Sequence, residues 1–163
     1  MEQHHYLGYK PLAGAQLRYL IWNANELTGG LGFGAAAWSI ADRDRWIGWT
    51  PVQRQRQLHR VVNNNRFLIL PWMRIPHVAS HVLGQAARQL PEDWEDRYGY
   101  RPVLLESFVD QKRFSGCCYR AANWLCVGQT QGRGKLEKHH RRIVPIKWIF
   151  VYPLTANFRA RLN

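Results

Sequence analysis

The chain has 163 residues, of which 46% are hydrophobic, so it can bury the core of one domain but hardly of two. Its 23 Lys and Arg residues outnumber 11 Asp and Glu residues and give a formal charge of +12, which makes DNA the expected partner and RNA an alternative. No apolar run approaches the ~20 residues of a membrane span, and no secretory signal begins the chain. We therefore expect a cytoplasmic protein that does not bind membranes.

Hydrophobic periodicity and turn residues predict a series of strands and helices along the chain. Two strands come first, and a helix with a capping box follows them. A compact apolar strand, an amphipathic helix and a second apolar strand then predict a parallel crossover within a mixed sheet. A short helix and two strands complete the chain. In order, the predicted elements occupy residues 17–22, 31–38, 51–61, 66–70, 77–90, 102–110, 116–124, 125–128 and 148–152.

Capping residues and prolines set the boundaries of the two longer helices. Thr50, Pro51 and Gln53 supply a capping residue, a proline at the first helical position and a polar residue three positions after the cap. Pro91 is expected to end the amphipathic helix. The order of elements is that of the GNAT acyltransferases. It predicts an α/β (α+β) fold, a GNAT-like mixed β-sheet flanked by helices, in a single domain over residues 1–163.

Five segments are more specific than the order of the elements; they lie at residues 5–9, 43–49, 62–71, 116–124 and 127–134. They resemble the DruA domain family, which occurs in Druantia anti-phage systems and at the front of some transposase chains. The resemblance covers nearly the whole chain. It implies a setting in phage defence or mobile elements, with defence-system or transposase proteins as candidate partners, and it supplies no reaction.

A more distant resemblance bears on chemistry. Arg66, Ser80, the strand end 107–110 and the segment 116–124 are similar to stretches of the phage Mom proteins, GNAT-like enzymes that modify adenine in DNA. This resemblance implies catalytic roles for three residues: Asp110, Tyr119 and Ser80. The residues themselves leave structural alternatives open, namely a loop cap for the aspartate, core packing for the tyrosine and a helix cap for the serine.

Other polar residues predict neither a metal site nor a particular cofactor. Residues 71–80, where a GNAT enzyme would hold the CoA pyrophosphate, contain no glycine and two prolines, which disfavours acetyl-CoA and leaves the cofactor unknown. The three cysteines form no CxxC pair, Cys117 and Cys118 are expected to be small buried residues, and the paired histidines lack metal-ligand spacing. Glu106 is expected to form an ion pair with Arg66 or Arg120.

Nucleic-acid contact is predicted for basic residues on the first helix, in the loop after the central strand and in the glycine-containing loop near residue 135. These residues are Arg54, Arg56, Arg60, Arg74, Arg133, Lys135, Lys138, Arg141 and Arg142. Three tryptophans are candidates for stacking on an unpaired base: Trp46, Trp49 and Trp72.

Three hypotheses of function follow. The first is a DNA-associated domain that transfers a small group to DNA or to a bound substrate. The second is a non-catalytic nucleic-acid-binding module with the same fold. The third is a CoA-dependent N-acetyltransferase, against which the glycine-poor segment 71–80 argues.

Overall fold

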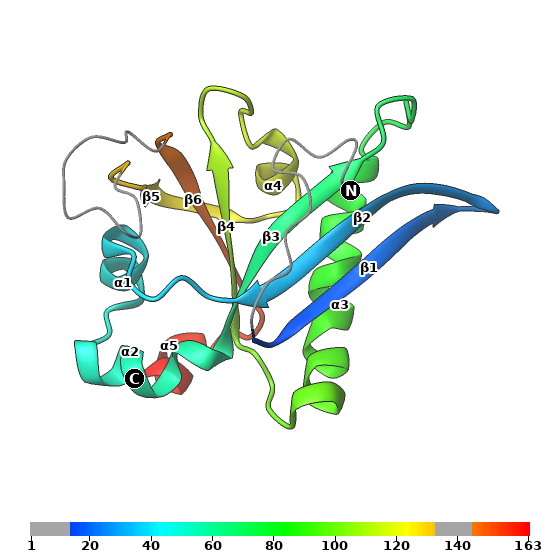
Figure 1. The fold of residues 1–163 in the computed structure, drawn as a ribbon. Helices are drawn as coiled ribbons and strands as arrows, with labels where there is room; N and C mark the ends of the chain where they lie inside the picture. Colours follow the sequence, from blue (N-terminus) through cyan, green and yellow to red (C-terminus); the bar gives the residue numbers. More distant parts are fainter. Residues whose placement is uncertain (1–13, 133–144) are drawn as a thin grey trace.

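A computed structural model describes residues 14–132 and 145–163 (Figure 1). Six strands form one sheet in the order β1-β2-β3-β4-β6-β5, and every neighbouring pair is antiparallel except β3 and β4. The mixed sheet and its parallel crossover are therefore confirmed. The strands are β1 (Gln16–Asn23), β2 (Glu26–Ala35), β3 (Val61–Ile69), β4 (Leu104–Asp110), β5 (Leu125–Gln129) and β6 (Lys147–Pro153).

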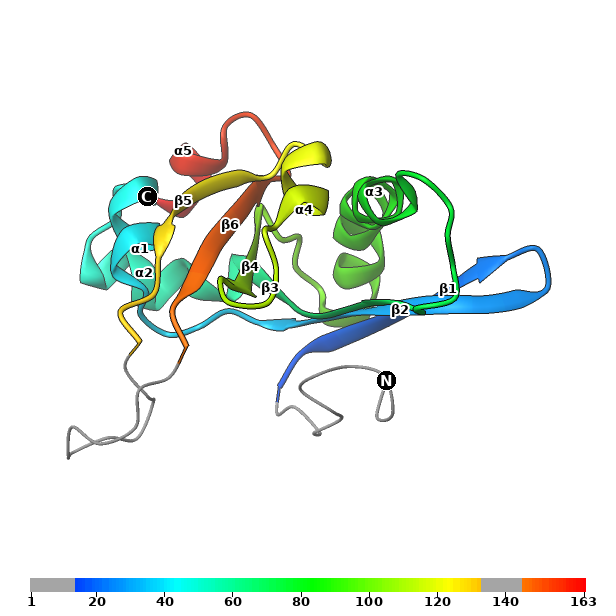
Figure 2. The same cartoon turned by 90° about the horizontal axis from the view of Figure 1, so that it is seen from above.

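Helices pack on both faces of this sheet and divide the core in two. The buried residues of α3 and α4 share one cluster with Leu105, Val109 and Phe150, whereas those of α1 and α5 share a second cluster with Leu104 and Ile149. Figures 1 and 2 both show α3 crossing β1 and β2 on one face of the sheet. The helices are α1 (Ala41–Ile47), α2 (Pro51–Gln57), α3 (Val78–Tyr98), α4 (Cys117–Ala121) and α5 (Phe158–Leu162).

The capping box at the start of α2 is confirmed, but the helix is shorter than predicted. The Thr50 hydroxyl accepts from the Gln53 N–H at 3.2 Å, and the Gln53 side chain accepts from the Thr50 N–H at 2.6 Å. A short 3₁₀ turn, Leu58–Arg60, follows α2, and β3 begins at Val61. Val61 is fully buried, and a buried β-branched residue favours the strand over another helical turn.

The prediction that Pro91 ends the amphipathic helix is wrong. Helix α3 continues through Pro91 to Tyr98, and Gly99 ends it with φ at 75°. The added turns bury Trp94 completely, and this apolar burial outweighs the hydrogen bond that the proline removes. None of the helices in residues 14–132 and 145–163 is long and apolar enough to cross a membrane.

Other boundaries also differ from the predictions. β2 begins at Glu26 and ends at Ala35, instead of covering 31–38, because a two-residue turn at Ala24 (φ 49°) and Asn25 joins it directly to β1. Helices α1 and α5 were not predicted, since each has too few residues to show a helical period.

A buried ion pair ties α1 to the sheet. Arg43 and Glu106 are both fully buried, and Arg43 Nη1 donates to Glu106 Oε2 at 2.6 Å. The second carboxylate oxygen accepts from the Ala37 N–H at 2.9 Å. Burial raises the pKa of Glu106, while the Arg43 guanidinium opposes that rise. An ion pair was predicted for Glu106, but the partners named, Arg66 and Arg120, were wrong.

Candidate functional site

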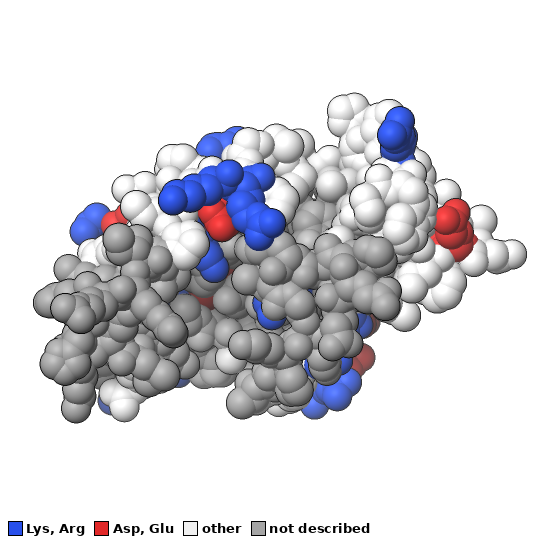
Figure 3. Space-filling view, turned by 45° about the horizontal axis from the view of Figure 1, so that its top comes forward, with Lys and Arg blue, Asp and Glu red and all other residues white. Residues whose placement is uncertain are grey.

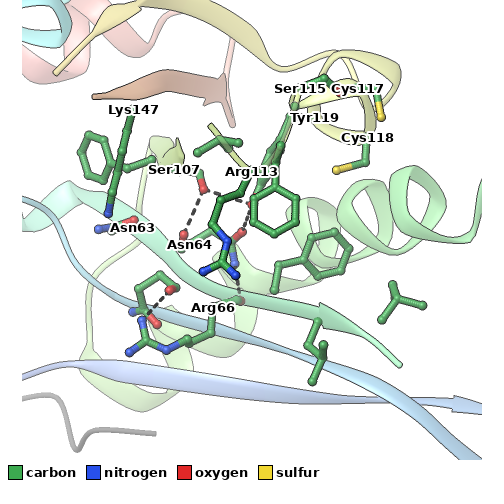
Figure 4. A pocket seen from close by; sticks show the side chains of 18 of the residues that line it. Asn63, Asn64, Arg66, Ser107, Arg113, Ser115, Cys117, Cys118, Tyr119 and Lys147 are labelled. Carbon is green, nitrogen blue, oxygen red and sulfur yellow. Dashed lines mark hydrogen bonds between the residues drawn. The ribbon is translucent and has the colours of Figure 1, made fainter. Parts of the chain in front are cut away.

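The two parallel strands at the centre of the sheet diverge. β3 and β4 pair from Val61↔Leu104 to Asn64↔Ser107, after which β3 continues to Ile69 and β4 to Asp110 outside the ladder. A pocket of about 790 Å³ occupies the opening between them (Figure 4). Its lining comes from β3 and Pro71 after it, from β4 and its following loop, from α4, and from Lys147 at the start of β6.

Gly116 positions α4 against the pocket. It precedes the helix with φ at 72°, a left-handed conformation that favours glycine. A Cβ at this position would lie 2.6 Å from two atoms of the Phe150 ring, so a side chain there would push α4 away from β6. Close packing places Tyr119 on Phe150, with ring centroids 5.3 Å apart and planes 20° from parallel. Tyr119 therefore faces the point where the strands part.

Three buried polar side chains meet at that point. The Tyr119 hydroxyl donates to Asn64 Oδ1 at 2.7 Å, and Ser107 Oγ lies 3.0 Å from both the Asn64 carbonyl oxygen and the Tyr119 hydroxyl (Figure 4). Asn64 Nδ2 donates in turn to the Gly32 carbonyl at 3.0 Å, which fixes the orientation of the amide. We call these three residues the vertex cluster; it forms the inner end of the pocket.

The charged side chains around the pocket are all basic among the residues that the structure describes. Arg66, Arg113 and Lys147 line it from three elements, and no Asp or Glu lies in the described lining (Figure 4). Figure 3 shows Lys and Arg side chains gathered at this end of the sheet, around a small area of acidic surface. Converging cations in a concave site attract an anion, because low-dielectric walls focus their field.

Of the three residues predicted to be catalytic, the structure places only Tyr119 in the pocket lining. Asp110 is 6% exposed, and its Oδ1 accepts from the Lys112 N–H at 3.0 Å, as a loop cap does. Ser80 lies in the first turn of α3 and donates to the His77 carbonyl at 3.0 Å. Catalytic roles for Asp110 and Ser80 stay predictions that the described pocket does not support.

The residues predicted to contact nucleic acid are spread over the molecule. Arg54 and Arg56 belong to α2, at the end of the sheet away from the pocket (Figure 1), and Arg54 pairs with Asp44 at 3.1 Å. Arg60 lies in the 3₁₀ turn after α2, not on the same helix as predicted, and donates to the Arg161 carbonyl. Arg74 is exposed between β3 and α3. Outside the described residues lie Arg133, Lys135, Lys138, Arg141 and Arg142.

Two of the three tryptophans proposed for base stacking are engaged elsewhere. Trp46 stacks on Phe158 with centroids 5.1 Å apart, and Trp49 is buried. Trp72, between β3 and α3, is 54% exposed, and its stacking on a base stays a prediction. The proposed role therefore fits Trp72 best of the three.

Sequence reasoning missed most of the pocket, although one signal was present. Asn63, Asn64 and Asn65 follow one another in the middle of β3, and asparagine is disfavoured in strands. A run that breaks a local preference inside a central strand often marks a functional or strained site. Ser107 belongs to the strand end 107–110 that resembles the Mom proteins, whereas no signal singled out Arg113 or Lys147.

The two neighbouring cysteines differ in accessibility, and the prediction that both are buried is wrong for Cys117, which is exposed. Burial raises the pKa of the Cys118 thiol to about 11, and the adjacent Cys117 adds to that rise.

We expect iodoacetamide at pH 8 to modify Cys117 well before Cys118, because the thiolate is the nucleophile. Labelling of Cys118 should increase as the pH rises toward 11; peptide mass analysis measures both rates, and equal rates at pH 8 would contradict the difference.

Two features of the described residues bear on a metal ion and on CoA. Residues 14–132 and 145–163 contain no group of three or more His, Cys, Asp or Glu side chains that could hold a metal ion. Pro71 is the one residue of the β3–α3 connection that lines the pocket, and proline has no N–H to offer a phosphate. Pro71 therefore cannot donate a main-chain hydrogen bond to a pyrophosphate in this pocket.

Comparison with solved structures identifies the fold as that of the GNAT acetyltransferases. A spermidine N-acetyltransferase SpeG mutant from Vibrio cholerae matches 93% of this chain over 71% of its own, at 10% identity and a TM-score of 0.55. A GNAT acetyltransferase from Streptococcus pneumoniae matches 85% of this chain over 67% of its own, at 11% identity and a TM-score of 0.52. A Bacillus subtilis acetyltransferase in complex with CoA matches 85% over 76%, at 8% identity and a TM-score of 0.52.

Within this fold, the chain belongs to the DruA family. The family model of Druantia protein DruA matches residues 1–144. No curated protein matches the sequence. The GNAT-like mixed sheet and the DruA resemblance expected from the sequence are thus both confirmed.

Proposed function

We propose that this DruA-family domain binds DNA through the pocket between β3 and β4, as part of a phage-defence or mobile-element system. The observation that carries the proposal is the pocket lining, where Arg66, Arg113 and Lys147 converge and no described residue is acidic. Arginine and lysine contacts to phosphate dominate the affinity of proteins for nucleic acids. The formal charge of +12 and the membership of a defence family support the same function.

A salt titration of DNA binding tests the proposal. We expect the affinity for a fluorescein-labelled 20-base-pair duplex to fall steeply with salt, because bound phosphates release counterions. Arg113→Gln combined with Lys147→Gln should reduce the slope of log K against log [salt] by about 2, because each phosphate that a side chain neutralises adds about 0.9 to the slope. Fluorescence anisotropy measures both quantities.

The matched control is Arg88→Gln combined with Arg97→Gln, which removes two exposed charges from α3 that do not line the pocket. This variant should keep most of the wild-type slope. Salt-independent binding by the wild-type chain would contradict the proposal, and so would an equal loss of slope in the two double variants.

The position of Tyr119 favours a second candidate function, transfer of a small group to DNA or to a bound substrate. Its hydroxyl lies in the pocket with that of Ser107. The described lining holds no Asp, Glu or His to accept a proton near neutral pH, however, so binding without chemistry has the stronger support. A CoA-dependent acetyltransferase has the support of the fold alone. Mass analysis of nucleosides from expressing cells tests the transfer, and an unmodified spectrum with intact DNA binding would contradict it.

A further inference from the structure

One face of β1 carries three solvent-exposed side chains, an arginine and two large apolar residues. Arg18, Leu20 and Trp22 alternate with Leu17, Tyr19 and Ile21, which pack toward α3, so the first three share the opposite face. Leu20 is 65% exposed and Trp22 is 57% exposed. β1 is the edge strand of the sheet, and its hairpin with β2 extends beyond α3 in Figures 1 and 2.

The strand register joins this face to the pocket. Arg18 pairs with Gly32 in β2, and Gly32 pairs with Arg66 in β3, so the three residues lie in line across the sheet and project to the same side. A Cβ at Gly32 would lie 3.2 Å from Arg66 Cβ, so the glycine leaves room for the stem of Arg66. Arg66 also lines the pocket. The line of residues therefore leads from the pocket to the exposed face of β1.

We propose that an unpaired nucleic-acid strand binds along this line, with phosphates at Arg66 and Arg18 and a base stacked on Trp22. The proposal rests on the DNA binding proposed above and names its substrate class as single-stranded. The two arginines stand two strands apart, about 10 Å between Cα atoms, so their long side chains can reach successive phosphates. Arg18 Nη2 donates to Gln16 Oε1 at 2.9 Å, which keeps its guanidinium on β1.

A tryptophan ring on the surface distinguishes single strands from duplexes. Bases within a duplex already stack on their neighbours, whereas an unpaired base can stack on an exposed aromatic ring whatever its identity. Trp22 offers such a ring on the same face as Arg18, and the two lie four residues apart on one strand, about 13 Å along its axis. The charge of the arginines favours a polyanion over an apolar protein partner on this face.

The test titrates labelled dT20 and a labelled 20-base-pair duplex with the wild-type chain and with Trp22→Ala. We expect Trp22→Ala to weaken dT20 binding by at least about fivefold and to leave duplex binding unchanged, because only the unpaired strand loses a stacking partner. Trp22→Phe, which retains an aromatic ring, should recover most of the affinity. Arg18→Gln should lower the salt slope for dT20 by about 0.7.

Trp38→Ala is the matched control, because Trp38 is also 57% exposed but lies after β2, where Arg54 packs over its ring. It should bind dT20 as the wild type does, and equal melting temperatures would show that both variants fold. If wild-type binding to dT20 is salt-sensitive but Trp22→Ala does not weaken it, the proposed binding of an unpaired strand along β1 is wrong, and the pocket proposal still stands. Binding along β1 is also wrong if Trp22→Ala changes only the self-association of the protein, which size-exclusion chromatography measures. If the wild type binds neither DNA, both proposals fail.

Discussion

Arg43→Met is expected to lower the free energy of unfolding by about 3–5 kcal/mol, because it leaves the buried Glu106 carboxylate without its cation. Both side chains are fully buried, and Arg43 also donates to the Ala37 carbonyl and lies 2.8 Å from Asp44. The substitution therefore loosens the segment between β2 and α1 as well as the ion pair. Urea denaturation followed by tryptophan fluorescence measures the change.

A double-mutant cycle separates the charge from the packing. Arg43→Met combined with Glu106→Leu removes both charges and leaves apolar side chains of similar length, so its loss of stability should be smaller than the sum of the two single losses. Arg45→Met serves as the surface control, since Arg45 pairs with Asp42 in the open and should change stability by less than about 1 kcal/mol. Additive single losses would show that Arg43 and Glu106 are not coupled.

Tyr119→Ala is expected to cost about 3–5 kcal/mol, as the loss of a buried aromatic ring does. The Tyr119 ring is 7% exposed and packs against Phe67, Trp124 and Phe150. Tyr119→Phe keeps the ring but leaves Asn64 Oδ1 without its donor, which should cost about 1–3 kcal/mol. If both substitutions cost the same in urea denaturation, the hydroxyl rather than the ring would dominate.

The same pair of variants bears on function. The test applies to Tyr119→Phe protein that still folds and binds DNA. If the pocket only binds its ligand, this variant should preserve phage restriction by the complete defence system. If the hydroxyl takes part in group transfer, the variant should abolish restriction. Ser107→Ala is the companion variant, because it changes the same vertex cluster without removing the tyrosine. Efficiency of plating on cells that carry the system gives the result.

The order of the six strands and of α2, α3 and α4 was predictable because it depends on local patterns. Apolar runs, the Thr50 capping box and the short helix after Gly116 are all legible in the sequence. The prediction from Pro91 was wrong because a helix can continue through a proline when its later turns bury apolar side chains. Here the later turns of α3 bury Trp94 in the core. The same dependence on tertiary contacts hid the partner of Glu106, which lies 63 residues away in the chain.

The pocket was less predictable, because its charges come from distant elements. Arg66, Arg113 and Lys147 belong to β3, the loop after β4 and the start of β6, and they meet through the parallel pairing and its divergence. The short motif around Tyr119 was a better guide than composition. The same resemblance pointed to Asp110 and Ser80, whose described contacts are those of local caps.

The divergence of β3 and β4 has a consequence for specificity. β2 pairs with one side of β3 from Val62 to Ile69, but β4 pairs with the other side no further than Asn64. In the described part of the chain, β3 therefore has no neighbouring strand on its pocket side beyond Asn64, and the peptide groups that do not point toward β2 border the pocket. On this border the Asn65 carbonyl accepts from Arg66 Nη1 at 2.7 Å, and the Arg66 carbonyl accepts from Asn64 Nδ2 at 3.0 Å. Side chains of the lining, instead of a neighbouring strand, therefore satisfy these main-chain groups. Substituting Asn64 or Arg66 should therefore change the main-chain course of the pocket border together with its polarity or charge.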